Sequence, residues 1–325
     1  MLRKIDWDSQ VGRRLRLRDL HVFFTVAQDG SMSKAAARLG VSTPTVSEAI
    51  AGLEHGLGVR LFDRGPKGVE PTRYGDALLK RTLIVFDELK QSIRDIEHLA
   101  DPAAGEIRIA CPLAITLTII PQILDRFVKQ YPRVAVHLDE VTPSSSQHDL
   151  QDLRDRKYDL VLGRGASLLA EPSVDDLNIE VLFNDQLVIA ASPKSKWAAR
   201  RKIDLAELID EPWIMQGPQT WNYRNLAEAY QARGLVLPKA GVTTLSMSVI
   251  RHFLSDGQFI TSMPRSVARF LSLKVLPVDL PARPWPVFVT TLKHRTPSPV
   301  VARFIACARD FTRSMREDRT TRASS

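Results

Sequence analysis

Three short stretches near the N-terminus constrain the fold of this chain most strongly, because each is apolar at three- to four-residue spacing and each is followed by a glycine. They cover residues 17–29, residues 33–39 and the residues that follow Ser42. This spacing predicts amphipathic helices, and glycine is the residue that most often ends a helix. Only three or four residues separate the second stretch from the third. The pattern therefore predicts a helix-turn-helix unit.

Local signals place the ends of these helices. Asp29-Gly30 ends the first, Ser33 can cap the second, and Ser42 opens the third, with Pro44 tolerated in its first turn. Residues 61–72 follow as two short extended pieces around a Gly/Pro turn, which predicts a basic hairpin, or wing.

A long helix is predicted from Tyr74 to about Leu99, with one apolar stripe along it. A stripe on a helix between two domains needs a partner, and a second copy of the chain would supply one. The residues predicted to pair in this dimer are Leu78, Val85, Leu89, Ile93 and Ile96.

The chain after the hinge at residues 101–105 alternates strand-like and helix-like runs, which predicts an α/β fold with largely parallel sheets. The expected strands are 107–110, 134–141, 159–162 and 187–191, and the expected helices are 119–130, 148–156, 221–233 and 249–254. Two small lobes are expected, with the chain crossing near Ile179 and returning near Trp285.

Composition narrows the function. Hydrophobic residues make up 44% and charged residues 25% of 325 residues, which is typical of globular domains. Residues 1–75 hold 12 Lys and Arg against 8 Asp and Glu, so half of the net charge of +8 lies there and an acidic partner such as nucleic acid is favoured. No run approaches a membrane span, and residues 1–11 lack the apolar core of a secretory signal, so a cytoplasmic location is expected.

The sequence contains no recognisable motif of an enzyme active site. The seven histidines match no metal-ligand spacing, the two cysteines are far apart, and no GxSxG, GxGxxG or Walker loop is present. No catalytic residue, metal site or cofactor is therefore predicted. Two classes of binding protein fit the sequence less well. A solute-binding protein would need a secretory signal, and a non-specific architectural DNA protein would lack a large cleft domain.

The N-terminal motifs resemble those of the LysR-type transcriptional regulators. The matching positions are Leu17-Arg18-x-Leu20-x-x-Phe23-x-x-Val26-Ala27, Pro44-x-Val46-Ser47, Leu53-Glu54-x-x-Leu57-Gly58, Leu61-Phe62-x-Arg64 and Thr72-x-x-Gly75. The resemblance implies an all-α winged helix-turn-helix DNA-binding domain over 1–75 and a linker and dimerisation helix over 76–100. It also implies an α/β two-lobed effector domain over 101–325, similar to periplasmic binding proteins, with lobe 1 at about 105–178 and 285–315 and lobe 2 at about 179–284.

The partners expected from this resemblance are double-stranded DNA, a small-molecule effector, and the chain itself as a homodimer or homotetramer. RNA polymerase is considered as a further partner. Phrases around Glu180 and Trp213 are similar to the branch with sugar-responsive and aromatic-acid-responsive members, so sugars and organic or aromatic acids are the effector classes considered.

DNA contacts are expected from the start of the third helix, because a recognition helix inserts its N-terminal residues into the major groove. Ser42 could equally be a helix cap without a base contact, and the wing residues could form a solvated charged loop. The candidate DNA-binding residues are Ser31, Ser33, Ser42, Thr43, Pro44, Ser47, Glu48, Arg64, Lys67 and Arg73.

Effector contacts are expected at strand ends in the cleft between the lobes. Arg164 could clamp a carboxylate or hydroxyls, or could instead form an internal ion pair across the lobes. The segment from Cys111 to Ala114 is more apolar than the Ser/Thr that the family often has there, which disfavours an anion at that place. The candidate effector residues are Thr116, Thr142, Arg164, Gln216, Ser246 and Thr261.

Overall fold

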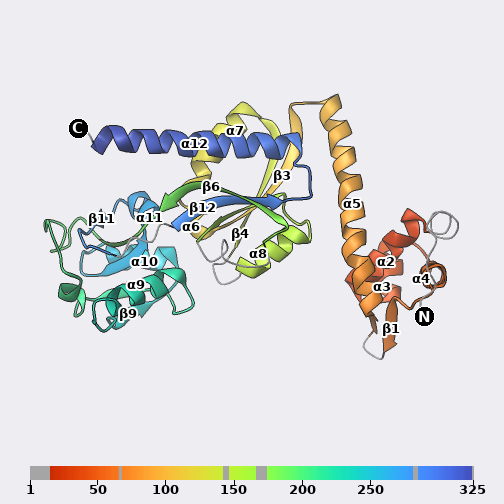
Figure 1. Cartoon of the computed structure of the whole chain (residues 1–325), viewed down its shortest axis with the longest axis horizontal. Coiled ribbons are helices and arrows are strands. Elements are labelled where there is room, and N and C mark those ends of the chain that lie inside the picture. The colour runs from red at the N-terminus through yellow and green to blue at the C-terminus, as the bar shows by residue number, and fades with distance from the viewer. Residues whose placement is uncertain (1–14, 66–67, 142–145, 166–173, 281–284, 324–325) are drawn as a thin grey trace. The chain divides into compact units, whose positions relative to one another are not determined.

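The computed structural model describes residues 15–65, 68–141, 146–165, 174–280 and 285–323. The chain divides into two compact units, residues 1–93 and residues 94–325. Figure 1 labels most of their helices and many of their strands.

Within the described residues, three short helices begin the first unit: α2 (Leu17–Asp29), α3 (Met32–Leu39) and α4 (Thr43–Leu57). The glycine that follows each helix adopts the left-handed conformation, with φ of 60° at Gly30, 66° at Gly40 and 69° at Gly58, and each backbone N–H bonds back to the helix. The predicted stops are confirmed. The predicted cap of α3 is wrong: Ser31 is the capping residue, and Ser33 lies inside the first turn.

The wing follows as the antiparallel hairpin of β1 (Phe62–Gly65) and β2 (Gly68–Pro71). Glu54 of α4 fixes its first strand, because Glu54 Oε1 accepts the backbone N–H groups of Leu61 at 2.7 Å and Phe62 at 3.2 Å. Helix α5 (Arg73–Ala100) then runs without a break, as predicted. At its start Gly75 leaves room for the wing: a Cβ there would lie 2.1 Å from the carbonyl oxygen of Leu61.

Two five-stranded sheets form the second unit. The first sheet has the order β4-β3-β5-β12-β6 and the second β11-β7-β10-β8-β9. The strands of the first are β3 (Ala104–Pro112), β4 (Arg133–Val141), β5 (Leu160–Arg164), β6 (Leu177–Asp185) and β12 (Trp285–Leu292). Those of the second are β7 (Leu187–Ala191), β8 (Trp213–Met215), β9 (Ala240–Thr243), β10 (Ile260–Pro264) and β11 (Lys274–Val275).

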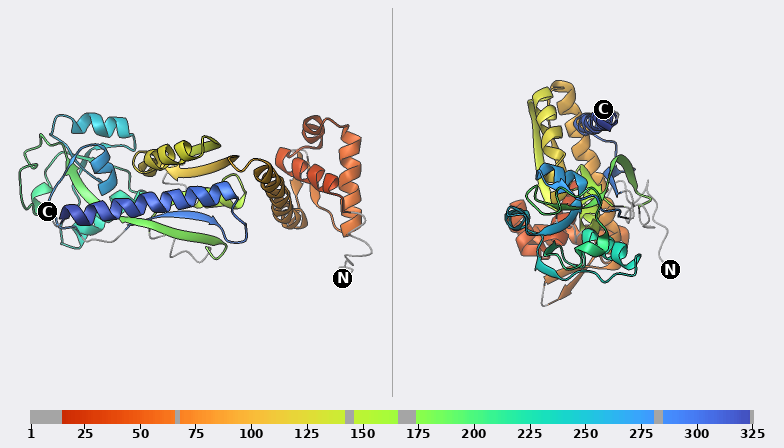
Figure 2. Two further views of the ribbon diagram at one scale, coloured as in Figure 1. Left: turned by 90° about the horizontal axis from the view of Figure 1, so that it is seen from above. Right: turned by 90° about the vertical axis from the view of Figure 1, so that its left-hand side faces the viewer.

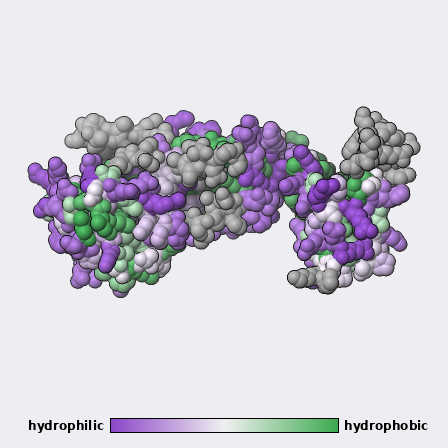
Figure 3. Space-filling view, turned by 60° about the horizontal axis from the view of Figure 1, so that its bottom comes forward, coloured by the Kyte–Doolittle hydropathy of each residue, from purple (hydrophilic) through white to green (hydrophobic). Residues whose placement is uncertain are grey.

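Helices cover both sheets. On the first, α7 (Ile120–Gln130) and α12 (Pro299–Ala323) lie side by side, as Figures 1 and 2 show, and Phe127 packs edge-on against Phe304 between them. Helix α8 (Ser146–Arg154) packs on β5 and β12. The other described helices of the unit are α6 (Leu113–Thr116), η4 (Leu205–Leu208), α9 (Trp221–Gln231), α10 (Met247–Leu254) and α11 (Arg265–Phe270). Figure 3 shows a largely hydrophilic surface, with a hydrophobic patch at the end of this unit that carries the second sheet.

The two-lobed α/β prediction is confirmed, but the sheets are mixed rather than largely parallel. β12 returns from the second lobe and pairs antiparallel with both β5 and β6, and β7 pairs antiparallel with β10 and β11. The chain crosses between lobes after Asp185, later than the predicted crossing near Ile179, because β6 pairs with β12 along Leu177–Asp185. The predicted return at Trp285 is where β12 begins.

Candidate functional site

The first turn of α4 presents a polar, exposed edge of the first unit. Ser42 caps this helix: its Oγ accepts the backbone N–H of Thr45 at 3.3 Å and bonds Thr45 Oγ1 at 2.8 Å. The capping role considered for Ser42 is therefore confirmed, while the residue itself remains exposed.

The side chains beyond the cap are held by a rigid support. Val46 and Ile50 are buried on the inner face of α4 in the helical core. On the outer side Thr43, Pro44 and Glu48 are exposed and Ser47 is half-buried. This arrangement packs one side of the helix into the core and leaves the side chains of its first turn exposed.

Ser31 and Ser33 lie together at the start of α3. Their hydroxyls are 3.0 Å apart, and Ser31 Oγ accepts the backbone N–H of Lys34 at 3.4 Å. Lys34 is exposed beside them, which adds a positive charge that sequence reasoning had not singled out.

Basic side chains flank the wing. Arg64 on β1 is exposed, and Arg73 at the start of α5 donates to Tyr74 Oη at 2.6 Å with its guanidinium 4.6 Å from the centre of the Tyr74 ring. Lys67 lies outside the described residues. Arg73 is thus orientated by Tyr74.

The stripe predicted along α5 is largely uncovered within this chain. Val85, Leu89, Ile93 and Ile96 are between 40% and 66% exposed. Leu78 differs, because it packs half-buried against the core of the first unit. Four large aliphatic side chains therefore line an exposed helix face.

The second unit contains a cavity of about 200 Å³ between its two sheets. Three of the six predicted effector residues line it: Arg164 from β5, Gln216 after β8, and Thr261 on β10. The expectation that strand ends from both lobes meet in the cleft therefore holds for these three residues.

The other three predicted effector residues are not in the described lining. Thr116 donates to Glu140 Oε2 at 2.8 Å and to the carbonyl oxygen of Leu113, and Ser246 is the exposed N-cap position of α10. Thr142 lies outside the described residues. Strand-end position alone could not tell which side of a strand end faces the cavity.

Arg164 forms an internal ion pair, which was considered beside its possible role as a ligand clamp. The pair lies within the first sheet and not across the lobes as expected, because Asp185 is on β6. Its Nη2 lies 3.1 Å from Asp185 Oδ2, and the two side chains are only 8% and 1% exposed. Asp185 also accepts the Ser266 hydroxyl at 2.5 Å and the Gln186 backbone N–H at 2.9 Å, so both lobes hold this carboxylate. Burial lowers the pKa of Arg164 to about 10, against the opposing effect of Asp185.

Sequence reasoning missed the aromatic and amide residues of the cavity. Trp221 of α9 stacks on Trp285 of β12 with their planes 14° apart, and the Arg164 guanidinium lies 4.7 Å from the Trp285 ring centre. Asn222 is buried and its Nδ2 donates to Gln216 Oε1 at 3.1 Å. Little in the sequence indicated that these two tryptophans lie at one site. Trp221 is the first residue of a predicted helix, and Trp285 lies where the chain was expected to return to the first lobe.

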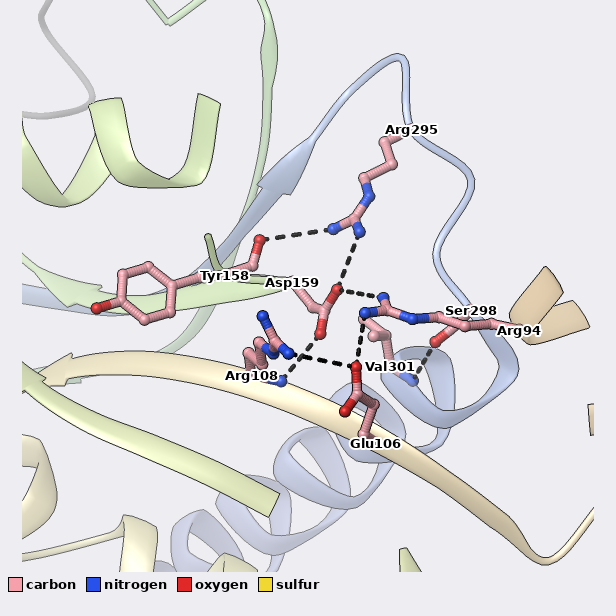
Figure 4. Close-up of polar contacts among 8 residues, drawn as sticks. All are labelled: Arg94, Glu106, Arg108, Tyr158, Asp159, Arg295, Ser298 and Val301. Carbon is pink, nitrogen blue, oxygen red and sulfur yellow. Dashed lines mark hydrogen bonds and ion pairs between the residues drawn. The ribbon is translucent and has the colours of Figure 1, made fainter. Parts of the chain in front are cut away.

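A second polar cluster lies where the end of α5 meets the first sheet of this unit (Figure 4). Asp159, with 5% of its side chain exposed, faces Arg295 at 3.0 Å and Arg94 at 3.4 Å, and its Oδ2 accepts the backbone N–H of Arg108 at 2.9 Å. Arg94 also bonds Glu106 at 2.7 Å. One buried carboxylate thus joins the last turns of α5, β3 and the chain after β12.

Two negative findings concern the part of the chain that the structure describes. No three His, Cys, Asp or Glu side chains lie close enough together there to hold a metal ion, and no described helix is long and apolar enough to cross a membrane.

Comparison with known proteins identifies both units. Residues 17–76 match the bacterial regulatory helix-turn-helix protein family of the lysR type, and residues 100–313 match the LysR substrate binding domain. The HTH-type transcriptional regulator TdcA of Escherichia coli is 30% identical over 245 residues, covering 75% of this chain and 76% of that protein. A regulator of the same organism with no characterised role, YdcI, is 26% identical over 276 residues, 83% of this chain and 87% of its own.

Solved structures of the same fold agree over most of the chain. A full-length variant of OxyR from Pseudomonas aeruginosa aligns with a TM-score of 0.63 at 21% identity, covering 92% of this chain and 95% of that one. Full-length CbnR in complex with its target DNA aligns with a TM-score of 0.52 at 21% identity, covering 92% and 100%.

Proposed function

Because this chain belongs to the LysR family of DNA-binding transcriptional regulators, we propose that the first turn of α4 reads its operator. The family consists of regulators with an effector-binding domain and not of enzymes. The observation that carries the proposal is the exposed turn at Thr43 and Pro44 on a helix whose other face is locked into a core. Major-groove base edges offer partners for the Thr43 hydroxyl, and Pro44 can pack on a thymine methyl.

The remaining DNA contacts are proposed to position the protein on the backbone. Arg64 on the wing and Arg73 at the start of α5 carry charges that can neutralise phosphates, and Arg64 can also enter a narrow minor groove. Ser31 and Ser33, with the N-terminus of α3, can hold a further phosphate. Ser42, Ser47 and Glu48 complete the proposed face.

A second copy of the chain is the proposed cover for the α5 stripe. Val85, Leu89, Ile93 and Ile96 leave aliphatic surface exposed at helical spacing, and pairing the same face of two copies would bury it. The dimer would place two α4 helices at half-sites about 34–36 Å apart, or at a multiple of that spacing. Association of two dimers into a tetramer on DNA is part of the same proposal.

The cavity between the lobes is the proposed effector site, with Arg164, Gln216 and Thr261 at its wall. Effector binding would shift the population of lobe arrangements and so change the angle and spacing at which the oligomer holds DNA, with RNA polymerase as the machinery that responds. The cytoplasm is the proposed location, because the chromosomal DNA of a bacterium lies there. The effector classes considered are sugars and organic or aromatic acids. The apolar lining of the cavity suits the ring of an aromatic compound.

The test is DNA binding by the full-length chain, measured by fluorescence anisotropy on the DNA upstream of its own gene and on random DNA across a salt series. The Arg64→Ala variant should weaken binding to both DNAs and lower the salt slope by about 1, since one phosphate contact is lost. Lys129→Ala is the matched control, because it removes an equal charge from the exposed surface of the second unit.

Thr43→Ala should instead reduce the preference for the specific site while leaving the salt slope unchanged. Equal affinity of the unaltered chain for specific and random DNA would refute the operator-reading role of α4.

A further inference from the structure

We propose that the effector is an uncharged single-ring aromatic molecule with an amide-like hydrogen-bonding group, and neither a carboxylic acid nor a sugar. This inference rests on the proposed role of the cavity as the effector site.

Size and lining favour one apolar ring. An apolar cavity of about 150 Å³ accommodates benzene, so a volume of about 200 Å³ has room for a ring with one small substituent. The described lining is predominantly aliphatic and aromatic, including Leu113, Ala114, Leu150, Met247, Ile250 and Phe288. A sugar needs a hydrogen-bond partner for each of its hydroxyls, and each one left without a partner costs about 1–3 kcal/mol. The hydroxyls of Thr220 and Thr261 in this lining already donate to the carbonyl oxygens of Gly217 and Ile214.

The charge balance of the wall disfavours an anion. Arg164 is already neutralised by Asp185 at 3.1 Å, with both side chains almost fully buried. A carboxylate placed beside this pair would bring an uncompensated negative charge into a desolvated site. Arg224 is the other charged residue of the described lining, but it is exposed, and exposed ion pairs contribute only about 0–1 kcal/mol.

Two neutral amide side chains of the lining offer a donor together with an acceptor. Asn222 Nδ2 donates to Gln216 Oε1 at 3.1 Å, which joins the two amides. Within the described residues, Asn222 Oδ1 and Gln216 Nε2 form no hydrogen bond, although Asn222 is only 6% exposed. An acceptor and a donor held in this way suit a ligand that offers both, as a primary amide or a lactam does.

The aromatic wall supports the same ligand class. The stacked Trp221 and Trp285 join α9 of one lobe to β12 of the other at the cavity. Aromatic rings gain about 0.5–1.5 kcal/mol beyond burial from offset or edge contacts with one another. A planar ring seated between the lobes would therefore add to a contact that already spans them.

Titration calorimetry of the full-length chain with benzamide, benzoate and glucose tests the proposal, because benzamide and benzoate share size and shape and differ in charge. The expected result is that benzamide binds at least about 10-fold more tightly than benzoate and that glucose gives no binding heat. Benzoate binding as tightly as benzamide, glucose binding more tightly than either, or no binding of benzamide would each overturn the proposal.

Three variants show whether binding occurs at this cavity. Ala114→Phe fills the cavity and should abolish benzamide binding, whereas Lys129→Ala should leave it unchanged. Asp185→Asn removes the carboxylate that neutralises Arg164 and should raise benzoate affinity at least about 10-fold; circular dichroism shows whether this variant is folded, and the first two variants decide the matter if it is not. Retention of benzamide binding in Ala114→Phe would contradict the proposed site.

The same preparation is assayed for DNA binding without ligand, which separates two failures. Operator binding without benzamide binding overturns the ligand class and leaves the regulator intact. Benzamide binding without DNA preference supports the ligand class and refutes the proposed operator reading.

Discussion

Replacing Asp159 by Asn should destabilise the second unit by about 3 kcal/mol. Asp159 and Arg295 are 5% and 8% exposed and 3.0 Å apart, and removing one partner of a buried pair costs about 3–5 kcal/mol because the other charge is left uncompensated. The lower figure applies because Arg94 retains Glu106 at 2.7 Å and is partly exposed. Asn cannot repair the site, since its NH₂ group would face either the backbone N–H of Arg108 or a guanidinium.

The measurement is urea denaturation of the full-length chain, followed by circular dichroism, with a thermal scan as a second probe. A loss of about 3 kcal/mol corresponds to a fall in Tm of about 6–12 °C for the transition of a unit of this size. The isosteric change keeps the volume of the side chain, so packing loss does not contribute.

The Arg108→Gln variant is the control within the same cluster (Figure 4). Arg108 binds Asp159 through its backbone N–H, and its side chain makes only a half-exposed contact with Glu106 at 3.6 Å. This substitution should cost less than about 1 kcal/mol. Equal effects of the two substitutions, or a loss below about 1 kcal/mol in Asp159→Asn, would refute the assignment of Asp159 as the central acceptor.

Single contacts lead to three further predictions. Gly75→Ala should lower the unfolding temperature of the first unit, because its Cβ would meet the Leu61 carbonyl oxygen at 2.1 Å; an unchanged melting curve would contradict this packing. Burial raises the pKa of the Cys111 thiol to about 12 and also raises the pKa of the Cys307 thiol. Both thiols of the folded chain should therefore resist iodoacetamide at pH 8 and react with it in urea. Rapid labelling of either thiol in the folded chain would contradict this. The hydrogen bond from Arg154 lowers the pKa of Asp176 below its ordinary value of 3.8. The Asp176 carboxylate therefore stabilises the fold above pH 3.8, and this contribution is lost as the pH falls through the lower pKa of the folded state. In acid unfolding of Asp176→Asn, the loss of stability between these two pH values should be correspondingly less steep.

The helical unit could be predicted almost residue by residue because its signals are local. Glycines at 30, 40 and 58 stop the helices through their own backbone conformation, and each acts within one turn of its position. The error at the cap of α3, Ser33 in place of Ser31, arose because two serines two residues apart give the same composition signal. Only the first has the extended backbone that a cap requires.

The sheets of the second unit were less predictable because strand direction depends on distant pairings. Alternating strands and helices correctly predicted α/β lobes, but the antiparallel entry of β12 depends on where a segment more than 100 residues beyond β5 returns. The pairing of β6 with β12 likewise keeps Leu177–Asp185 in the first sheet. No signal within β6 itself marks that choice.

The cavity shows most clearly where sequence reasoning ends. Arg164 stood out because a guanidinium at a strand end could clamp a carboxylate or hydroxyls. Its partner Asp185 lies 21 residues away and becomes its partner only when β5 and β6 flank β12. Leu113 and Phe288 are residue types that usually pack in a hydrophobic core. Only the tertiary structure shows that they line a cavity. Charged residues are therefore the candidates that a sequence makes visible, whereas the ion pair that neutralises Arg164 and the apolar side chains around it become apparent only in the structure.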